Sequence, residues 1–326
     1  MPSLVSILIT AYNAGPWLAE TLDSAARQTW PSTEIIVVDD GSTDDTLAVA
    51  RRYEERGVRV ITQQNLGACA ARNVAIAHAT GDFFQFLDAD DLLALDKVEV
   101  QMRRLVDEPS GTVASGPWAR FYNNDLATAT FTPDAVWQDF DPASDWLVRS
   151  WQGGGMMAPF AWLVPRDLVE AAGPWNETLR LNQDGEYFTR VLTRAVRVSF
   201  CPDAEGYYRS GITTSISKRR DHATFASFFH ATELCAAHLL SVLDTPEARH
   251  ACACLWQTFA FRAYPFAPRL VRQAEARAEA FGGCDMEQDG SPAIKRLRSL
   301  IGWKPAERLR RTYYRLRYGH ATGVRS

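Results

Sequence analysis

Short apolar runs alternate with segments of helical periodicity along the first hundred residues of the chain. Buried strands are predicted at 5–10, 34–38, 59–62 and 83–87. Helices are predicted between and after them, at 17–28, 43–56, 68–78 and 92–105. Strands that alternate with helices form a mostly parallel sheet covered by helices on both faces. The pattern therefore predicts a doubly wound, Rossmann-like α/β fold.

The pattern changes after Pro109. Residues 112–165 are rich in aromatic residues, glycine and proline, and we expect an irregular region there that shapes the substrate site. A helix and a strand are predicted to follow, at 184–193 and 196–200.

The last third of the chain is predicted to be helical, with breaks at prolines and at Gly282-Gly283. We therefore expect an α/β domain over 1–219 and a helical C-terminal appendage over 220–326.

Charge is unevenly distributed along the 326 residues, whose formal net charge is −4. Residues 295–326 contain ten Lys and Arg and a single acidic residue, so they carry +9 and the preceding residues carry −13. An acidic body with a basic tail predicts an anionic partner for the tail.

The basic tail also has an apolar stripe at helical spacing, made of Ala306, Leu309, Tyr313 and Leu316. A narrow stripe flanked by arginines suits a helix that lies on an anionic membrane surface, which would involve 295–318. A solvated helix docked against the acidic body explains the stripe equally well. Nucleic acid is not an expected partner, because no recognised binding fold accompanies the charge.

The six cysteines are scattered and form no CxxC pair. We expect them to be reduced thiols, neither a disulfide framework nor a zinc site. The sequence has no secretory signal pattern, and no apolar run approaches the roughly 18–20 residues needed to cross a bilayer. A cytoplasmic location is expected, with a peripheral position at the inner face of the cell membrane as a further expectation.

Acidic residues follow two of the predicted strands. The segment after the first strand begins Thr10-Ala-Tyr-Asn, and the second strand ends at Asp39. Because ligands bind at the carboxyl ends of strands in open α/β sheets, these residues predict a nucleotide site. The Asp39 carboxylate could accept the imide N–H of a uracil, with backbone groups of Thr10 and Ala11 completing recognition. A turn or helix N-cap role for these acids is the structural alternative.

A second acidic cluster, Asp88-Ala-Asp90-Asp91, follows the strand at 83–87. Carboxylate oxygens combined with diphosphate oxygens and water suit Mg²⁺ or Mn²⁺. Such an ion would neutralise the charge on a departing nucleotide diphosphate. An N-cap role for Asp90 or Asp91 is again the alternative.

Five motifs, in this order, resemble those of a family-2 glycosyltransferase of GT-A fold, a resemblance that covers about residues 3–215. They are VSILITAYN, VVDDGSTDDT, NLGACAARN, FLDADD and NQDGEYFTR. The resemblance implies a metal-dependent inverting hexosyltransferase, with a nucleotide site lined by Thr10, Ala11, Tyr12, Asp39, Arg72 and Asp88. It also implies that Asp90 holds the Mg²⁺ or Mn²⁺ ion and that Asp184 is the general base. A helix N-cap role is the structural alternative for Asp184.

Several other residues are candidates for acceptor or phosphate contacts. Glu186 stands four residues before Arg190, in the order that favours an exposed helical ion pair, so this is its simpler role. Arg209 and Lys218 lie in a stretch of cations and hydroxyls that could close over the diphosphate. The His that family members often carry there is missing. Trp162 could stack on a sugar, although such aromatics are more often core.

These observations predict transfer of a hexose from a nucleotide-diphosphate sugar, with a UDP-hexose expected, to a hydroxyl of a glycan or lipid-linked acceptor in polysaccharide assembly. The alternative from another class is a catalytically silent module that binds sugar nucleotides or glycans. A nicotinamide-dependent dehydrogenase is disfavoured, because the first strand is followed by AYNAG and not by GxGxxG.

Overall fold

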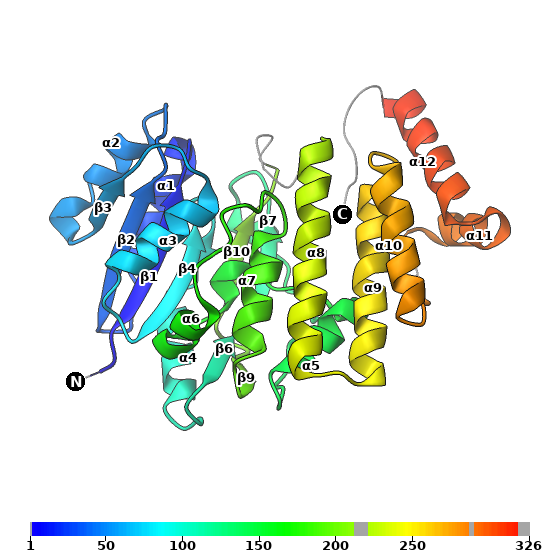
Figure 1. Cartoon of the computed structure of the whole chain (residues 1–326). Helices are drawn as coiled ribbons and strands as arrows, with labels where there is room; N and C mark the ends of the chain where they lie inside the picture. The colour runs from blue at the N-terminus through cyan, green and yellow to red at the C-terminus, as the bar shows by residue number, and fades with distance from the viewer. Residues whose placement is uncertain (1, 212–220, 287–289, 319–326) are drawn as a thin grey trace.

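The computed structural model describes residues 2–211, 221–286 and 290–318. Its largest sheet has five strands in the order β3-β2-β1-β4-β8, parallel except for the edge pair β4–β8 (Figure 1). These strands are β1 Val5–Ala11, β2 Thr33–Asp39, β3 Arg59–Thr62, β4 Phe83–Asp88 and β8 Val164–Pro165. The mostly parallel α/β fold predicted from the sequence is confirmed.

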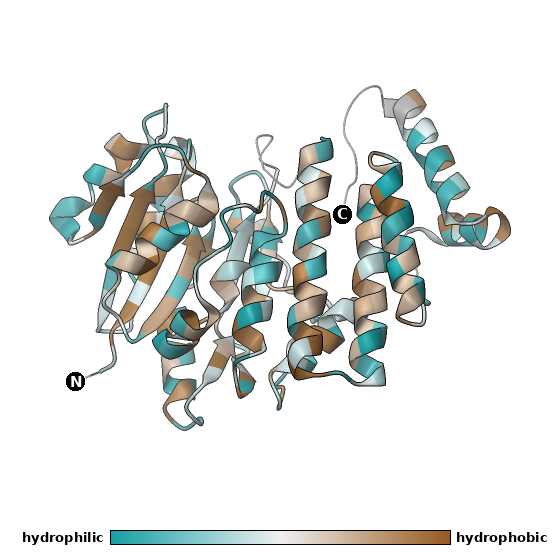
Figure 2. Ribbon diagram, viewed as in Figure 1, coloured by the Kyte–Doolittle hydropathy of each residue, from teal (hydrophilic) through white to brown (hydrophobic). Residues whose placement is uncertain are grey.

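Helices cover both faces of this sheet because its strands are apolar on both sides, as expected for buried parallel strands (Figure 2). One face packs against α1 and α2, through a core that includes Ile9 and Leu22. The other face packs against α3 and α7, through a core that includes Leu8, Phe86 and Tyr187. The helices of this part of the chain are α1 Gly15–Ala26, α2 Thr46–Arg51, η1 Glu54–Arg56, α3 Ala68–His78, α4 Lys97–Leu105, α6 Arg166–Ala172 and α7 Gln183–Leu192.

The region predicted to be irregular contains more regular structure than expected. Two small sheets are present, with strand orders β5-β10-β7 and β6-β9. Their strands are β5 Leu92–Leu93, β6 Thr112–Ser115, β7 Trp118–Phe121, β9 Arg197–Phe200 and β10 Gly206–Arg209. The helical segments of this region are η2 Leu126–Thr128, α5 Ser144–Arg149, η3 Ser150–Gly154 and η4 Pro159–Ala161.

The predicted helix over 92–105 was wrong in its first turn. Leu92 and Leu93 form β5, which pairs with β10, and α4 begins only at Lys97. The strand conformation of this segment depends on pairing with a strand more than a hundred residues away, and local periodicity cannot reveal such a partner.

Two of the C-terminal helices, α8 and α9, share a core with the α/β part of the chain. Ala236 and Leu239 of α8 and Cys252 of α9 belong to the same core cluster as Phe86 of β4. The boundary expected at 219/220 falls at the edge of residues 212–220, which lie outside the described part. The helices are α8 His222–Val242, α9 Pro246–Ala263, α10 Pro268–Ala280, α11 Pro292–Ile301 and α12 Trp303–Tyr318.

The expectation that all six cysteines are reduced was wrong for one pair. Cys254 of α9 and Cys284, just after α10, form a disulfide with their Cα atoms 5.0 Å apart. The two cysteines are separated by 30 positions along the chain, and the helices α9 and α10 fold back on each other, so the thiols meet although the sequence spacing gives no sign of it. The other four cysteines are free and buried.

No helix in the described ranges combines the length and the apolar character that crossing a membrane requires.

Lys97 is fully buried, and no carboxylate in the described part of the chain pairs with it. Its ammonium group donates to the side-chain oxygens of Gln85 at 2.7 Å and of Gln101 at 2.6 Å. Burial lowers the pKa of Lys97 to about 7. The charged form is therefore disfavoured in the folded chain relative to the unfolded chain.

This burial makes stability depend on pH in a predictable direction. Between pH about 7 and about 10 the unfolded chain binds more protons at Lys97 than the folded chain, so the free energy of unfolding should rise with pH. Lys97→Met should remove this contribution, which is on the order of 4 kcal/mol over the whole window. Urea unfolding of both proteins across this pH range measures the difference in slope, with the exposed Lys295→Met as the control. Equal slopes for the wild type and Lys97→Met would contradict the assignment.

Candidate functional site

The register of the parallel strands brings the predicted acidic residues to one edge of the sheet. Ala11 at the end of β1 is paired with Asp39 of β2, and Thr10 is paired with Asp88 of β4. The two carboxylates therefore stand on either side of the central strand's end, as the sequence order predicted.

Asp39 is buried and only partly satisfied by hydrogen bonds. It is 1% exposed, and its Oδ2 accepts the Ser42 N–H at 3.4 Å. Its Oδ1 has no hydrogen-bond partner among the described residues. A buried carboxylate oxygen without a donor is costly unless a ligand supplies one. Tyr12, 51% exposed, stands just beyond the end of β1.

The neighbouring acids have structural roles, as the alternative interpretation proposed. Asp40 accepts the backbone N–H groups of Leu66 and Gly67, both at 2.9 Å, and so holds the loop that leads into α3. Asp44 accepts the N–H of Thr46 at the start of α2. Asp39 is thus distinguished from them by its unpaired oxygen.

Asp88 is held by an arginine from α3. Arg72 Nη2 lies 2.7 Å from Asp88 Oδ1, and its guanidinium lies over the Trp175 ring at 4.4 Å from the ring centroid. Arg72 Nη1 also approaches Gln183 Oε1 of α7 at 3.4 Å. Arg72 is buried, whereas a third of the Asp88 side chain is exposed, so Asp88 faces the open side of the site.

A second arginine holds the turn that follows Asp88. The Arg209 N–H donates to Asp91 Oδ1 at 2.8 Å, and its Nε donates to the Asp90 carbonyl at 2.7 Å. Its Nη2 pairs with Glu20 of α1 at 2.8 Å. Neither Asp90 nor Asp91 is an N-cap, because α4 begins at Lys97 after Asp96.

The carboxyl groups at this turn are so close together that ionisation of all of them is disfavoured. Burial and the nearby Asp88 raise the pKa of Asp90 to about 6. Burial, Asp90 and Asp88 raise the pKa of Asp91 well above its ordinary value, and Asp91 Oδ2 finds no donor within the described part of the chain. An oxygen-rich, electronegative turn of this kind is suited to a hard divalent cation.

No three His, Cys, Asp or Glu side chains in the described ranges are gathered so that they could hold a metal ion by themselves. The acidic turn therefore offers an incomplete set of ligands. This arrangement fits an ion whose remaining ligands come from a bound diphosphate and water.

Asp184 lies in the first turn of α7, after Asn182, which is the N-cap. Burial raises the pKa of Asp184, while Arg72 lowers it and Asp88 raises it further. Its electrostatic neighbours are therefore the pair at the end of β4. A carboxylate with a raised pKa is a better proton acceptor than an ordinary aspartate.

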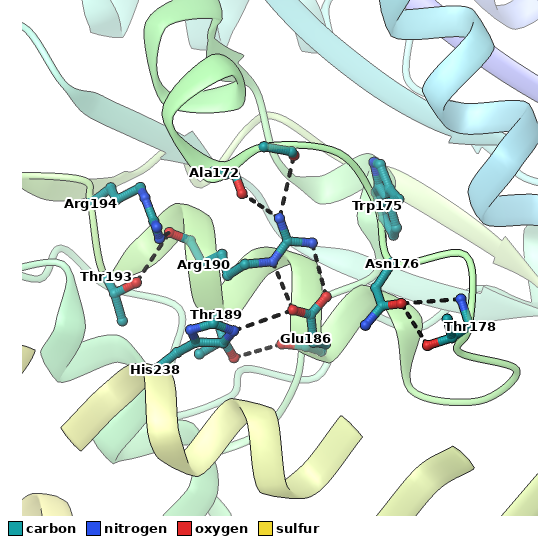
Figure 3. Close-up of polar contacts among 12 residues, drawn as sticks. Ala172, Trp175, Asn176, Thr178, Glu186, Thr189, Arg190, Thr193, Arg194 and His238 are labelled. Atoms are coloured by element: carbon teal, nitrogen blue, oxygen red, sulfur yellow. Dashed lines mark hydrogen bonds and ion pairs between the residues drawn. The ribbon is translucent and has the colours of Figure 1, made fainter. Parts of the chain in front are cut away.

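Glu186 is buried, so the prediction of an exposed ion pair was wrong. Its carboxylate binds Arg190 through two hydrogen bonds, at 2.7 and 2.9 Å, and His238 Nε2 of α8 lies 3.4 Å away (Figure 3). Arg190 also donates to the carbonyl of Ala172, the last residue of α6. The predicted partner Arg190 is confirmed, but both oxygens of Glu186 are engaged. Glu186 therefore joins α7 to α6 and α8 and is not free to contact an acceptor.

The other candidate contacts have different outcomes. Trp162 is 1% exposed and packs between Trp146 and Phe188, so its proposed contact with a sugar was wrong. Contact of Arg209 with a phosphate stays a prediction. Lys218 lies outside the described residues.

One surface cavity lies away from the strand ends. It has a volume of about 490 Å³ and is lined by Asn73, Trp175, Glu186 and His238 among others, but by none of Asp39, Asp88, Asp90 and Asp184. Because the aspartates carry the chemistry, the candidate site is the edge of the sheet and not this cavity.

Sequence reasoning missed the contact between Glu20 and Arg209. The two residues are 189 positions apart, and Glu20 has no local feature that marks it on α1. Gln183 was also missed, although its place beside Asp184 in the NQDGEYFTR motif was a usable signal.

Comparison with known proteins identifies the class of the site. Residues 6–170 match the family model described as Glycosyl transferase family 2. A 143-residue segment is 31% identical to "Glycosyltransferase GlyG" of Streptococcus pneumoniae serotype 4, covering 43% of this chain and 46% of that protein. The match thus spans less than half of GlyG.

Solved glycosyltransferases share the fold at low sequence identity. TarS 1-349 of S. aureus, in complex with UDP-GlcNAc, superposes with a TM-score of 0.69 at 19% identity, covering 95% of this chain and 92% of that one. The mannosyltransferase PcManGT of Pyrobaculum calidifontis, in complex with GDP-Man and Mn²⁺, gives a TM-score of 0.56 at 19% identity, covering 95% and 83%. These structures support the GT-A assignment of the fold.

Proposed function

Because the chain belongs to glycosyl transferase family 2, we propose that it is an inverting hexosyltransferase that uses a UDP-sugar as donor. Its acceptor would be a hydroxyl of a glycan or lipid-linked glycan in polysaccharide assembly. The proposal is carried by the placement of Asp39 and Asp88 on either side of the end of β1. Arg72 links Asp88 to Gln183, the residue before Asp184 on α7, which supports a place for Asp184 at the same site.

The nucleotide is assigned to the ends of β1 and β2. The unpaired Oδ1 of Asp39 accepts the imide N–H of the uracil, and Thr10 and Ala11 supply backbone contacts. Tyr12, exposed at the same edge, packs against the base. Asp88, held by Arg72, faces the ribose and diphosphate.

A divalent cation, Mg²⁺ or Mn²⁺, is assigned to Asp90. The raised pKa of this carboxylate, caused by burial and by Asp88, supports the assignment because a cation relieves the crowding of negative charge. When bound, the ion would stabilise the charge of the leaving diphosphate. Arg209, which binds the Asp90 carbonyl, fixes the backbone that presents this carboxylate.

Asp184 is assigned as the general base. It takes the proton of the acceptor hydroxyl as that oxygen attacks the anomeric carbon, and the bond from that carbon to the diphosphate breaks. A single displacement of this kind inverts the anomeric carbon and needs no enzyme nucleophile. The raised pKa of Asp184, caused by burial, matches this role.

The Asp184→Asn variant separates catalysis from donor binding. The amide cannot take a proton, so sugar transfer should fall by about 100-fold or more, while UDP affinity stays within about twofold. The transfer rate is measured as nucleotide release from UDP-glucose, UDP-galactose, UDP-GlcNAc and GDP-mannose with a panel of acceptors. The UDP affinity is measured by titration calorimetry. Asp167→Asn, exposed in the first turn of α6, is the control.

Two outcomes would contradict this assignment. Near wild-type transfer by Asp184→Asn would remove the residue from the base role. No release from any donor by the wild-type protein would favour the silent binding module over an enzyme.

Metal dependence is tested at Asp90. Asp90→Ala should lose Mn²⁺ binding in the presence of UDP, because the other acidic residues do not form a site by themselves. Titration calorimetry with Mn²⁺, with and without UDP, measures the loss, and the exposed Asp203→Ala provides the control. Mn²⁺ affinity that is unchanged in Asp90→Ala would exclude it as a ligand.

We further propose that the tail lies on an anionic membrane. One side of α12 docks on the body: Trp303 packs on Tyr264 at 5.1 Å, and Lys304 pairs with Glu275 of α10 at 2.6 Å. Glu307 is buried in ion pairs with Arg310 and Arg311, both at 2.7 Å, so it anchors the helix and partly neutralises it. Docking on the body, one of the two alternatives, is therefore present.

The opposite side of the tail is open. Leu309 and Leu316 of α12 are 54% and 81% exposed, and Leu300 at the end of α11 is 74% exposed. Ala306, which the sequence stripe placed with them, is instead buried against the body. Exposed leucines on basic helices fit a surface of anionic lipid.

Vesicle flotation tests the open face. The protein should float with vesicles of phosphatidylcholine and phosphatidylglycerol but not with phosphatidylcholine alone, and Leu309→Asp should reduce flotation about fivefold or more. Val106→Asp, at an equally open site after α4, should float like the wild type. Equal flotation of the Leu309→Asp and Val106→Asp variants would show that this face of α12 is not the membrane-binding surface.

A further inference from the structure

A second cavity lies beside β7, an edge strand of the three-stranded sheet. Its volume is about 330 Å³, within the range of small-molecule sites. It is lined by β7 and by the segment that follows η2, and its walls include Trp118, Arg120, Tyr122, Thr132, Asp134 and Trp137. Within the described residues β7 has a strand partner only on its other side, β10, so its backbone edge is open here (Figure 1).

The lining combines aromatic faces with both hydrogen-bond donors and acceptors. Tyr122 is 41% exposed, and the Trp118 indole is fixed by its N–H bond to the Met156 carbonyl at 3.0 Å. The Asp134 carboxylate is held by the Ala135 N–H at 3.0 Å. Flat apolar faces beside a carboxylate, a guanidinium and hydroxyls suit a ligand with many hydroxyl groups and apolar C–H faces, which is a sugar ring.

The charge of the lining favours a neutral sugar over an anionic ligand. Arg120 and Asp134 oppose each other in charge, so the cavity has no excess of positive charge to bind a phosphate. The hydroxyl of Thr132 makes no hydrogen bond within the described chain and is exposed, so it is available to a ligand.

The cavity is connected to the acidic turn through strand β10. The Arg120 guanidinium lies 4.7 Å from the centroid of Tyr208 and donates to Ser210 Oγ at 3.2 Å. The next residue of β10, Arg209, donates its backbone N–H to Asp91 Oδ1 at 2.8 Å. Two consecutive residues of β10 therefore contact a wall residue of the cavity and the acidic turn.

A second path joins the same two places. Asn124, in the turn after β7, donates to Glu20 Oε1 at 2.8 Å, and Glu20 Oε2 pairs with Arg209 at 2.8 Å. Arg209 is bound to the carbonyl of Asp90. The turn that follows the lining residue Tyr122 and the acidic turn are thus joined by a chain of hydrogen bonds through Glu20 and Arg209.

We infer that the cavity beside β7 binds one sugar unit of the acceptor glycan, a unit next to the one that receives the transferred hexose. This inference rests on the proposed function, because it assigns the substrate class of the same site. The enzyme therefore binds an acceptor of at least two sugar units, and it selects the acceptor through a sugar unit that takes no part in the reaction.

Saturation-transfer NMR tests the inference with defined probes, namely the methyl glycosides of glucose, galactose, mannose and N-acetylglucosamine. The wild-type protein should transfer saturation to at least one of them, in the presence of saturating UDP and Mn²⁺. Tyr122→Ala and Asp134→Asn should each reduce the effect about fivefold or more, because each removes a face or an acceptor from the wall. Tyr314→Ala, a substitution at similar exposure on α12, is the matched control.

The outcomes distinguish this inference from the proposed function. No saturation transfer to any probe, or equal transfer in the wild type and the two cavity variants, overturns the sugar subsite. Transfer that disappears when UDP is added would place the probes in the donor site and would also overturn it. If the protein binds a sugar in the cavity but does not bind UDP, the proposed UDP-sugar donor is refuted, whereas the proposed sugar subsite stands.

Discussion

The crowding of carboxylates at one edge of a parallel sheet is the constraint on which the rest of the site depends. Asp39 and Asp88 end the two strands that flank β1, and Asp90 and Asp91 follow Asp88 within one turn. Like charges in a buried place are costly, and the fold offsets this cost with two buried arginines from distant elements. Arg72 binds the strand end, and Arg209 binds the turn. The residues that fix the geometry are therefore cations, although the chemistry belongs to the acids.

The gathering of these acids could be predicted because parallel strands share one edge for their carboxyl ends. Order along the chain and the apolar runs were sufficient to place Asp39 and Asp88 together. The arginine partners differ in this respect. Arg72 lies in a motif, so a resemblance identified it, whereas the pairing of Arg209 with Glu20 across 189 positions depends on a small sheet that local patterns do not reveal.

The failures share a physical cause, which is that burial is a property of the whole fold. Trp162 and Glu186 are of types found at ligand sites, but both are buried here. Trp162 is enclosed by Trp146 of α5 and Phe188 of α7, and Glu186 is covered where α7 meets His238 of α8. Cys254 and Cys284 meet because α9 and α10 fold back on each other. None of these neighbours is close in the sequence, so periodicity and spacing carried no information about them.

The core that α8 and α9 share with the sheet has a consequence for how the molecule loses its structure. Helices that bury side chains such as Leu239 against the layer containing Phe86 cannot melt without exposing that layer to water. Melting should accordingly be one concerted event, in which a nucleotide held at the strand tips protects helices that it never touches. Chimeras that exchange the carboxy-terminal third for that of a relative must inherit a complementary inner surface along with it.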